Sequence, residues 1–312
     1  MSQAVAVLGA GVVGLSSAIT LARAGYRVEV LSRETSPHTT SDRAAAWFAP
    51  LSALGSPRWK PVVLDSLEQI QRLSQDPRYG VRALPVYELG PHPLTPPAMP
   101  ELRGVRDLED AFPAPWNHGF AFDSFQMDVP TYMARLTEEA KRLGIEFRAS
   151  VVSNFDEFQG SHRVIVNCTG LGARGLGDPA VYPIRGQVVR VSRPEGFPDA
   201  VVSGEGEEVT YVVPRLNDII LGGTYHHHAE GLEPDPSIAE AILERCLRLR
   251  PELAESRVLE HRVGLRPGRS EPRLELEPQG RLHIIHNYGH GSTGHTLAWG
   301  CARRVLALVE GL

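Results

Sequence analysis

Cysteine is scarce in this sequence, and the few cysteines lie far apart. Among 312 residues there are three, Cys168, Cys246 and Cys301, and no two of them have the CxxC spacing of redox or metal-binding motifs. This spacing argues against a disulfide framework and against a thiolate metal site, so we expect no metal. Isolated cysteines fit a reducing compartment, and we expect a cytoplasmic protein.

Long hydrophobic runs and an excess of positive charge are also missing. The apolar stretch from Val5 to Leu15 is interrupted by glycines and is too short to cross a bilayer, and no cleavable leader is recognisable. The formal net charge is −5, so we expect neither nucleic acid nor a membrane as a partner. With 42% hydrophobic and 22% charged residues, the composition is typical of a globular protein.

The N-terminal segment has the pattern of a strand, a glycine-rich turn, a helix and a second strand. Ala4–Leu8 is a continuous apolar run, typical of a parallel strand buried on both faces. Gly9–Gly14 follows with GxGxxG spacing. Leu15–Ala24 is predicted to be a helix, and Tyr26–Leu31 the next strand. In this setting the glycine motif predicts a dinucleotide site.

Each glycine of this turn has a physical reason. Gly9 permits the tight turn, Gly11 lets a pyrophosphate approach the backbone, and Gly14 lets the helix pack close to the strand. The N–H groups and the positive dipole end of the helix then attract the phosphates.

The residue at the ribose position is unusual. An acidic side chain normally ends the second strand and holds the ribose hydroxyls, but Ser32 stands here. Three arrangements stay open: Ser32 and Arg33 contact the adenosine, Glu34 reaches back to it, or Arg33 recognises the extra phosphate of NADP. The rest of the chain argues against NADP.

Four further motifs occur in order along the chain. They are TTSDRAAAW at 39–47, VIVNCTG at 164–170, RGQ at 185–187, and the pair VGLRP at 263–267 with HNYGHGSTGHT at 286–296. In kind, order and separation they resemble the D-amino-acid oxidase and D-aspartate oxidase family, and the chain looks most like a prokaryotic D-amino-acid oxidase. The resemblance covers almost the whole chain.

The resemblance implies an α/β protein with a Rossmann-type FAD-binding domain and a second, mixed-sheet α+β substrate domain. We assign the first to residues 1–50, 130–182 and 265–312, and the second to 51–129 and 183–264. The cofactor implied is FAD. The residues matched to it are Gly9, Ala10, Gly11, Val12, Val13, Gly14, Ser32, Arg33, Thr39, Thr40, Ser41, Ala45, Ala46, Trp47, Val152, Thr169, Gly170, Arg266, Gly291, Ser292, Gly294, His295 and Thr296.

The second glycine-rich stretch also indicates a flavin site without the family resemblance. Gly289, Gly291 and Gly294 precede an apolar helical segment, Thr296–Val309. A helix start of this kind can stabilise the negative charge that develops on a flavin ring during reduction. Two such turns at the two ends of the chain suit a long cofactor.

Three residues are matched to substrate contacts. Arg266 corresponds to the carboxylate-binding arginine, whose planar fork donates two charge-assisted hydrogen bonds. Tyr211 corresponds to a tyrosine that supports the same carboxylate, and Ser292 to a position whose main-chain carbonyl accepts the ammonium.

The implied reaction is FAD-dependent oxidative deamination of a D-amino acid by hydride transfer from Cα to flavin N5. The products are a 2-oxo acid, ammonia and hydrogen peroxide, and molecular oxygen is the second substrate. The protein supplies orientation and electrostatics, so no side chain is named as a catalytic acid or base.

The preference for substrate side chains rests on a short acidic segment, Glu205 to Glu208, where one family member type has an arginine. We therefore expect neutral or basic D-amino acids to be preferred over acidic ones. The alternatives are a glycine- or sarcosine-type amine oxidase, a flavin-binding relative without oxidase turnover, and an NAD(P)-dependent dehydrogenase. A homo-oligomer also stays open.

His226, His227 and His228 form a cluster that invites a metal interpretation. Consecutive residues of an extended chain point to alternate sides, so three neighbours do not converge on one ion. We interpret them as a polar loop after a strand at Ile219–Thr224.

Overall fold

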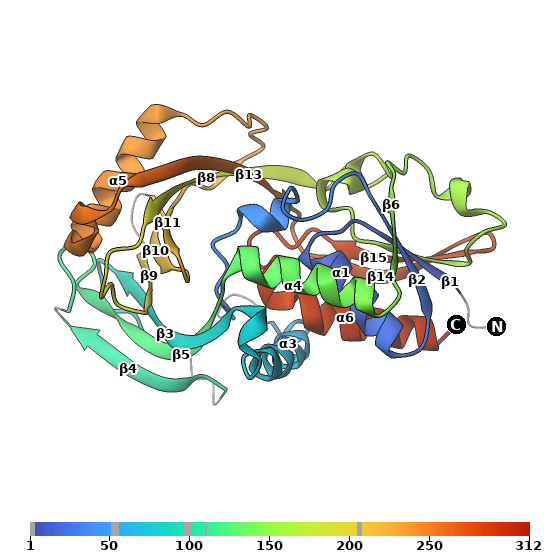
Figure 1. Cartoon of the computed structure of the whole chain (residues 1–312), viewed down its shortest axis with the longest axis horizontal. Coiled ribbons are helices and arrows are strands. Elements are labelled where there is room, and N and C mark those ends of the chain that lie inside the picture. The colour runs from blue at the N-terminus through green and yellow to red at the C-terminus, as the bar shows by residue number, and fades with distance from the viewer. Residues whose placement is uncertain (1–3, 51–55, 97–100, 110, 205–207) are drawn as a thin grey trace.

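In the computed structural model, residues 4–50, 56–96, 101–109, 111–204 and 208–312 are described. They form two β-sheets that lie side by side along the long axis of the molecule, with both termini at the end of the smaller sheet (Figure 1). The expected fold class, an α/β part with a second mixed-sheet part, is confirmed.

The smaller sheet is six-stranded within the described residues, and five of its strands, from β15 to β6, are parallel. β1 pairs in parallel with β2 and β7, β15 continues the parallel set beside β7, and β14 closes that edge antiparallel. Its strands, in spatial order, are β14 (Arg273–Gln279), β15 (Leu282–Tyr288), β7 (Val164–Asn167), β1 (Ala4–Leu8), β2 (Arg27–Ser32) and β6 (Glu146–Ala149). Val5–Leu8 is fully buried, which agrees with its unbroken apolar sequence.

Helices cover this sheet and supply most of its core. They are α1 (Val12–Arg23), α3 (Lys60–Leu73), α4 (Val129–Arg142) and α6 (Gly294–Glu310). α3 packs closely against α6, and the Gly300 amide donates to Ser66 Oγ at 2.8 Å. The predicted boundary at residue 50 assigns α3 to the second domain. In the structure, however, α3 packs on the helices of the smaller sheet. The predicted domain boundaries stay a prediction.

The larger sheet is mostly antiparallel and has nine strands among the described residues. β3 and β9 make its one parallel pair there, and α5 (Pro236–Leu249) packs apolar residues such as Ile242 on one face. The strands are β3 (Val81–Gly90), β4 (Arg103–Glu109), β5 (His118–Met127), β8 (Tyr182–Ser192), β9 (Val201–Gly204), β10 (Thr210–Pro214), β11 (Asp218–Gly222), β12 (His226–His227) and β13 (Val258–Gly268).

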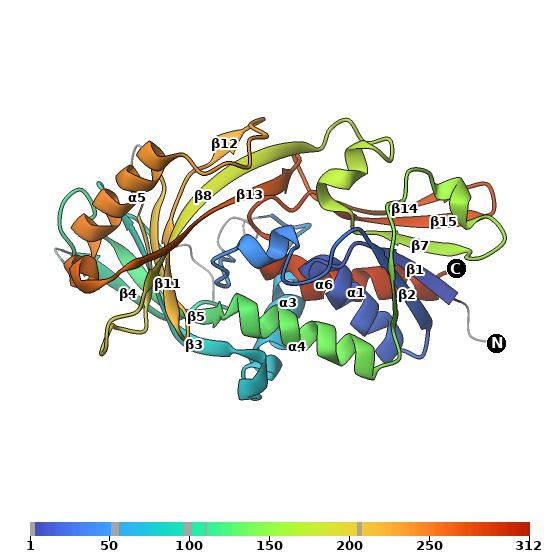
Figure 2. The same ribbon diagram turned by 45° about the horizontal axis from the view of Figure 1, so that its top comes forward.

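β8 and β13 are long paired strands that run from the large sheet to the edge of the small one (Figure 2). Where β13 ends, Pro267 lies against Gly170, which follows β7; a Cβ at Gly170 would be 3.6 Å from Pro267 Cβ. Short 3-10 helices occur at η1 (Thr40–Arg43), η2 (Pro77–Tyr79), η3 (Phe155–Phe158), η4 (Gly170–Arg174) and η5 (Pro251–Glu255). The substrate part thus reaches the nucleotide part directly through β13.

Two local expectations need correction. The first helix begins at Val12 rather than Leu15, because Gly11 has extended backbone angles and serves as its N-cap. The three histidines do not form a plain loop: His226 and His227 make the short strand β12 on β8, since their backbones pair with Arg185 and Ile184. Only His228 follows the strand.

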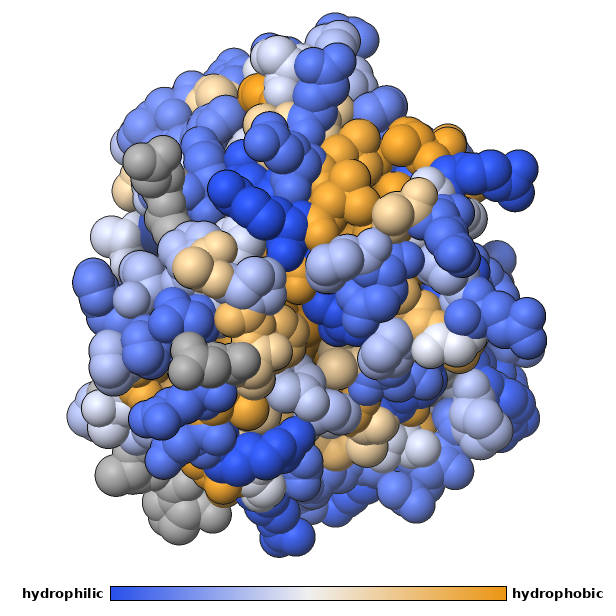
Figure 3. Space-filling view, turned by 90° about the vertical axis from the view of Figure 1, so that its left-hand side faces the viewer, coloured by the Kyte–Doolittle hydropathy of each residue, from blue (hydrophilic) through white to orange (hydrophobic). Residues whose placement is uncertain are grey.

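Seen from the end of the large sheet, the surface is mostly hydrophilic, with apolar residues gathered most densely in one patch and smaller apolar areas elsewhere (Figure 3). No helix in the described part of the chain combines the length and the apolar character that a membrane span requires.

Candidate active site and cofactor site

The residues expected to bind the dinucleotide come together at the carboxyl edge of the six-stranded sheet. Gly9 follows β1, Ser32 is the last residue of β2, and Thr169 follows shortly after β7. Parallel strands bring their carboxyl ends to one edge, where ligands of open α/β sheets bind.

The glycine turn before α1 is closed by backbone contacts. Gly9 has φ +103°, and a Cβ there would be 2.5 Å from the Cys168 carbonyl oxygen. A Cβ at Gly14 would be 1.9 Å from the carbonyl oxygen of Gly9. The turn therefore requires glycine at both positions, which brings α1 close to β1 and β7 and directs its N-terminus at the sheet edge.

The segment at 39–47 links the starts of α1 and α6. Ser41 Oγ accepts a hydrogen bond from the Val12 amide at 2.9 Å, and the Ser41 carbonyl lies 3.1 Å from His295 Nε2. Asp42 Oδ2 accepts from Thr39 Oγ1 at 2.6 Å and from the Thr39 amide at 3.0 Å at the start of η1, whereas Thr40 is exposed. Ala10 is buried in the glycine turn, and Val13 is a half-buried residue of the first turn of α1.

Ser32 organises the turn by its side chain. Its Oγ accepts from the Ala10 amide at 3.2 Å and donates to the Glu34 carbonyl at 2.5 Å. The serine thus fills the place of the usual acidic residue with a bond to the glycine turn itself. Arg33 is exposed, and Val152 is half-buried against the apolar cluster beneath β2.

Two buried polar atoms at the other end of the site have no partner among the described residues. They are Trp47 Nε1, an N–H donor, and His295 Nδ1. Burial lowers the pKa of His295, although the hydrogen bond to Ser41 and the charge of Asp42 act in the opposite direction, so the ring is neutral. Unpaired polar atoms beside two glycine-rich helix starts fit a ligand with several acceptors, as FAD has.

The backbone around these atoms is held from both sides. Ala46 has φ 56°, an unusual conformation for alanine, and its carbonyl accepts from Met127 N at 3.0 Å. Thr296 Oγ1 accepts from the Ala49 amide at 3.2 Å. Ala45 is buried beside Trp47 in the core cluster that contains Tyr211. The 39–49 segment is therefore fixed between α6 and the large sheet.

Arg266 lies on β13 in a slot made by glycine. A Cβ at Gly186 would be 2.2 Å from Arg266 Nη1, so the guanidinium lies directly over the β8 backbone. Nη1 donates to the Thr224 carbonyl at 3.1 Å, and the guanidinium is near enough to Tyr211 to favour the ionised form of its hydroxyl. The arginine is thus oriented before any ligand binds.

Tyr211 lies against Gly222 and Gly223. A Cβ at Gly222 would be 2.0 Å from the Tyr211 ring, so only glycine leaves room for it. The ring centroid is 5.3 Å from that of Trp47. Burial raises the pKa of Tyr211, and Arg266 only partly opposes this, so the hydroxyl keeps its proton and remains a donor.

Tyr225 is a site residue that the sequence reasoning missed. The Arg266 guanidinium lies over its ring at 5.0 Å, and a Cβ at Gly291 would be 3.5 Å from its hydroxyl. Tyr225 is 37% exposed, so it stands at the boundary between Arg266 and solvent. An aromatic residue two positions after the glycine pair at the end of β11 was the only signal for it.

Ser292 lies in the turn between β15 and α6, and its side chain is exposed. The preceding Gly291 has φ 54°, and its amide donates to the Pro267 carbonyl at 2.8 Å. This bond brings the turn of Ser292 and Gly294 to the end of β13, close to Arg266. The three residues expected at the substrate are therefore arranged around one place.

Other candidate sites do not join this region. No group of histidine, cysteine and acidic residues suitable for a metal occurs in the described ranges. The acidic segment expected to influence specificity falls mostly on 205–207, outside the described residues.

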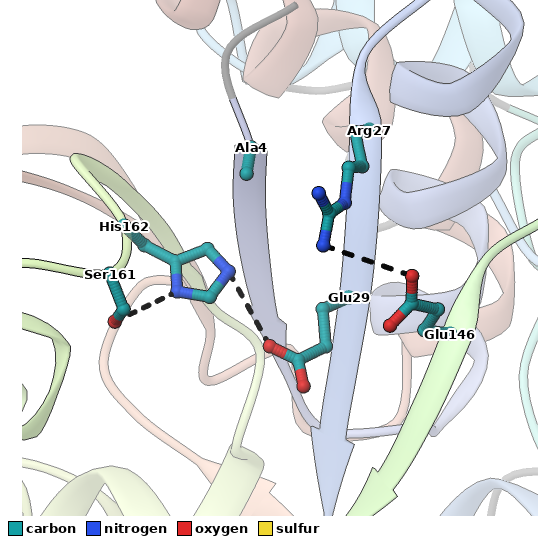
Figure 4. A pocket seen from close by; sticks show the side chains of 6 residues that line it. All are labelled: Ala4, Arg27, Glu29, Glu146, Ser161 and His162. Atoms are coloured by element: carbon teal, nitrogen blue, oxygen red, sulfur yellow. Dashed lines mark hydrogen bonds and ion pairs between the residues drawn. The ribbon is translucent and has the colours of Figure 1, made fainter.

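A cavity of about 240 Å³ lies at the opposite end of the small sheet (Figure 4). There His162 Nε2 is 3.4 Å from a Glu29 carboxylate oxygen, and Arg27 pairs with Glu146 at 3.9 Å. Ala4 and Arg27 begin their strands, so this cavity is separated from the glycine turns by the length of β1. None of the expected cofactor or substrate residues lines it.

Known proteins resemble this chain over nearly its full length. A family model described as "FAD dependent oxidoreductase" matches residues 4–308. The chain is 42% identical over 308 residues to a D-amino-acid oxidase of Rubrobacter xylanophilus, covering 97% of this chain and 94% of that protein. It is 32% identical over 327 residues to D-aspartate oxidase of Homo sapiens, covering 98% and 94%. The crystal structure of glycine oxidase from Geobacillus kaustophilus superposes with a TM-score of 0.86 at 20% identity, covering 99% of this chain and 95% of that one.

Proposed function

The chain belongs to the FAD dependent oxidoreductase family, and from that premise we propose that it catalyses the oxidative deamination of D-amino acids. The products are a 2-oxo acid, ammonia and hydrogen peroxide. Relatives named D-amino-acid oxidase support the substrate class. The observation that carries the proposal is the Arg266–Tyr211 pair beside Trp47, because it places a carboxylate anchor next to the segment expected to hold the flavin.

FAD is the cofactor of the family, and when bound it accepts the α-hydrogen of the substrate as hydride. The turn Gly9–Gly14 and Ser41 would hold its phosphates, since they combine a helix N-terminus with close backbone approach. Trp47 and the turn Gly291–Thr296 would contact its ring, and the unpartnered Trp47 Nε1 supplies a donor there.

The chain's own residues orient the substrate. Arg266 donates to the carboxylate, and the protonated hydroxyl of Tyr211 adds a second donor. The Ser292 main-chain carbonyl accepts from the amino group. These two contacts, together with the flavin that would receive the α-hydrogen, give three points of reference around Cα, so the arrangement would select one enantiomer. No side chain is needed to remove a proton from carbon.

We extend the proposal to neutral or basic D-amino acids as preferred substrates, on the acidic character of the segment ending at Glu208. The principal alternative is an amine oxidase for glycine or an N-methylated amino acid. The likeness to a glycine oxidase structure is at 20% identity and concerns the fold. The alternatives differ in the compound that yields peroxide, so one substrate panel separates them.

The decisive experiment is a peroxide assay with paired D- and L-amino acids, glycine and sarcosine, on wild-type protein and Arg266→Leu. We expect peroxide from neutral or basic D-amino acids, and none from L-amino acids, glycine or sarcosine. We expect Arg266→Leu to lose turnover by at least about 100-fold, since a charge-assisted bidentate contact is removed. Bound flavin should remain, as its absorbance will show.

Arg78→Leu is the matched control for this variant, because Arg78 is an exposed arginine on η2 that pairs locally with Asp76 at 2.7 Å. Wild-type activity is expected there. Peroxide from sarcosine or glycine alone would replace the D-amino-acid proposal, and full activity of Arg266→Leu would refute the site.

We also propose that the protein works in the reducing cytoplasm. The three cysteines are free, Cys246 and Cys301 are buried, and burial raises the pKa of Cys168 to about 12, which keeps its thiol protonated. A homo-oligomer stays a prediction that light scattering will test.

A further inference from the structure

Asp178 is a buried carboxylate that the proposed reaction does not use. It lies in the loop between η4 and β8 and is 7% exposed. Its Oδ1 accepts from the Ala180 amide at 3.0 Å, which fixes the carboxylate to its own loop. Its Oδ2 accepts hydrogen bonds from side chains of two other segments, so this carboxylate connects its own loop to both of them.

The two donors to Oδ2 belong to the two segments that carry the substrate contacts. Tyr288 donates its hydroxyl at 2.8 Å, and Arg269 donates Nε at 3.1 Å. Arg269 follows the end of β13, three residues after Arg266. Tyr288 is the last residue of β15, four residues before Ser292. Asp178 therefore connects the carboxylate side of the site to the ammonium side.

Other contacts make the connection stiff. Gly289 has φ +82°, and a Cβ there would be 2.9 Å from Arg269 Cβ, so the backbone of the turn packs closely against the aliphatic part of the Arg269 side chain. Arg273 Nη1 donates to the Tyr288 hydroxyl at 3.1 Å. Tyr288 is 2% exposed, and its hydroxyl donates one hydrogen bond to Asp178 and accepts one from Arg273.

The charges favour the same arrangement. Burial raises the pKa of Asp178, but the hydrogen bond from Tyr288, the Ala180 amide and the charge of Arg269 outweigh it and hold the pKa below its usual value. Burial, opposed by Arg273, raises the pKa of Tyr288 to about 12, so its hydroxyl remains a donor to the carboxylate.

We propose that Asp178 is a positioning residue that sets the separation between the carboxylate anchor at Arg266 and the ammonium acceptor at Ser292, by tying Arg269 to Tyr288. The inference rests on the proposed function. It predicts that removing the contacts of Asp178 with Arg269 and Tyr288 lowers the affinity for ligands that use both substrate contacts. The affinity for ligands that use only Arg266 should not change.

The test compares D-alanine with propanoate, which is the same molecule without its amino group. Tyr288→Phe removes the hydroxyl and leaves the ring and the Asp178–Arg269 pair in place; Asp178→Asn is the second variant. Half-saturation by D-alanine is read from anaerobic bleaching of the flavin, and the propanoate dissociation constant from the flavin spectrum. Melting temperature and flavin content report folding.

For both variants we expect the D-alanine half-saturation concentration to rise roughly tenfold, the equivalent of one lost charge-assisted hydrogen bond. The propanoate constant should stay within about twofold of the wild-type value. Tyr79→Phe is the control, since this buried hydroxyl bonds Glu139 away from the site.

Three results would overturn the inference: unchanged D-alanine binding in both variants, an equal loss for both ligands, or the same loss in Tyr79→Phe. If Asp178→Asn does not fold, Tyr288→Phe alone decides. A wild-type protein that is reduced by no D-amino acid refutes the proposed function instead, and is recognised before any variant is made.

Discussion

Two glycine-rich turns, each leading into a helix, meet at the proposed cofactor site, and they are held in different ways. The turn before α1 is closed by its own backbone and by the neighbouring strands. Gly9 N donates to Leu31 O at 2.8 Å, and the backbone of Gly14 packs directly against the Gly9 carbonyl. The turn before α6 is held by β13, the segment after it and α6: the Gly291 amide donates to the Pro267 carbonyl at 2.8 Å, the Arg269 side chain lies beside Gly289, and His290 contacts Cys301.

This difference separates two kinds of glycine. Gly14 is required by the fold, because protein atoms already occupy the space of a side chain. At Gly294 a Cβ would meet only Val12 Cγ1, at 4.0 Å, so protein atoms leave room for it. We infer that the first turn is shaped by the chain and the second is kept open for the ligand.

The largest effect is expected from Gly14→Ala. Its Cβ would lie 1.9 Å from Gly9 O and 2.9 Å from Gly9 C, so α1 must move away from β1. We expect the free energy of unfolding to fall by about 3 kcal/mol or more, with loss of bound flavin. Thermal unfolding and flavin absorbance of the purified protein measure both.

Gly175→Ala is the control for that substitution. Gly175 has φ −69°, and a Cβ there would meet only Gly172 O, at 3.5 Å. We expect wild-type stability and flavin content. A Gly14→Ala protein that also retains both would contradict the view that the first turn is closed by backbone contacts.

A second prediction uses pH to act on the α6 turn through His290. Burial lowers the pKa of His290 from 6.5 to about 4, and its Nε2 is 3.5 Å from Cys301 Sγ. In the unfolded chain His290 is protonated as the pH falls below about 6.5, whereas in the folded chain it stays neutral until about pH 4. Stability is therefore fully present above pH 6.5 and falls as the pH drops towards 4, by roughly 2 to 3 kcal/mol.

The measurement is melting temperature against pH for wild type, His290→Gln and the exposed-histidine control His38→Gln. We expect a flatter acid limb for His290→Gln only. Equal acid limbs in all three proteins would show that the α6 turn does not depend on a neutral His290.

The same contrast explains what the sequence could predict. Ala4–Leu8 and the glycine turn were located correctly because their partners lie within one strand–helix–strand unit. The carboxylate anchor was named from a motif, but its slot at Gly186 and its contact with Tyr225 depend on pairing between β8, β12 and β13. Such long-range register leaves no local pattern, and Asp178 carried no sequence signal for the same reason.

The smallest effect on stability, and the sharpest separation of the two turns, is expected from Gly294→Ala. Gly294 begins α6, where alanine is a better helix former, so the unfolding free energy of the apoprotein should stay the same or rise by up to about 1 kcal/mol. Flavin affinity should nevertheless fall, because the space that protein atoms leave beside Val12 is then narrowed. Thermal unfolding of flavin-free protein and flavin titration measure the two quantities separately. A destabilisation equal to that of Gly14→Ala would make both turns structural, and unchanged flavin affinity would mean that the cofactor does not approach Gly294.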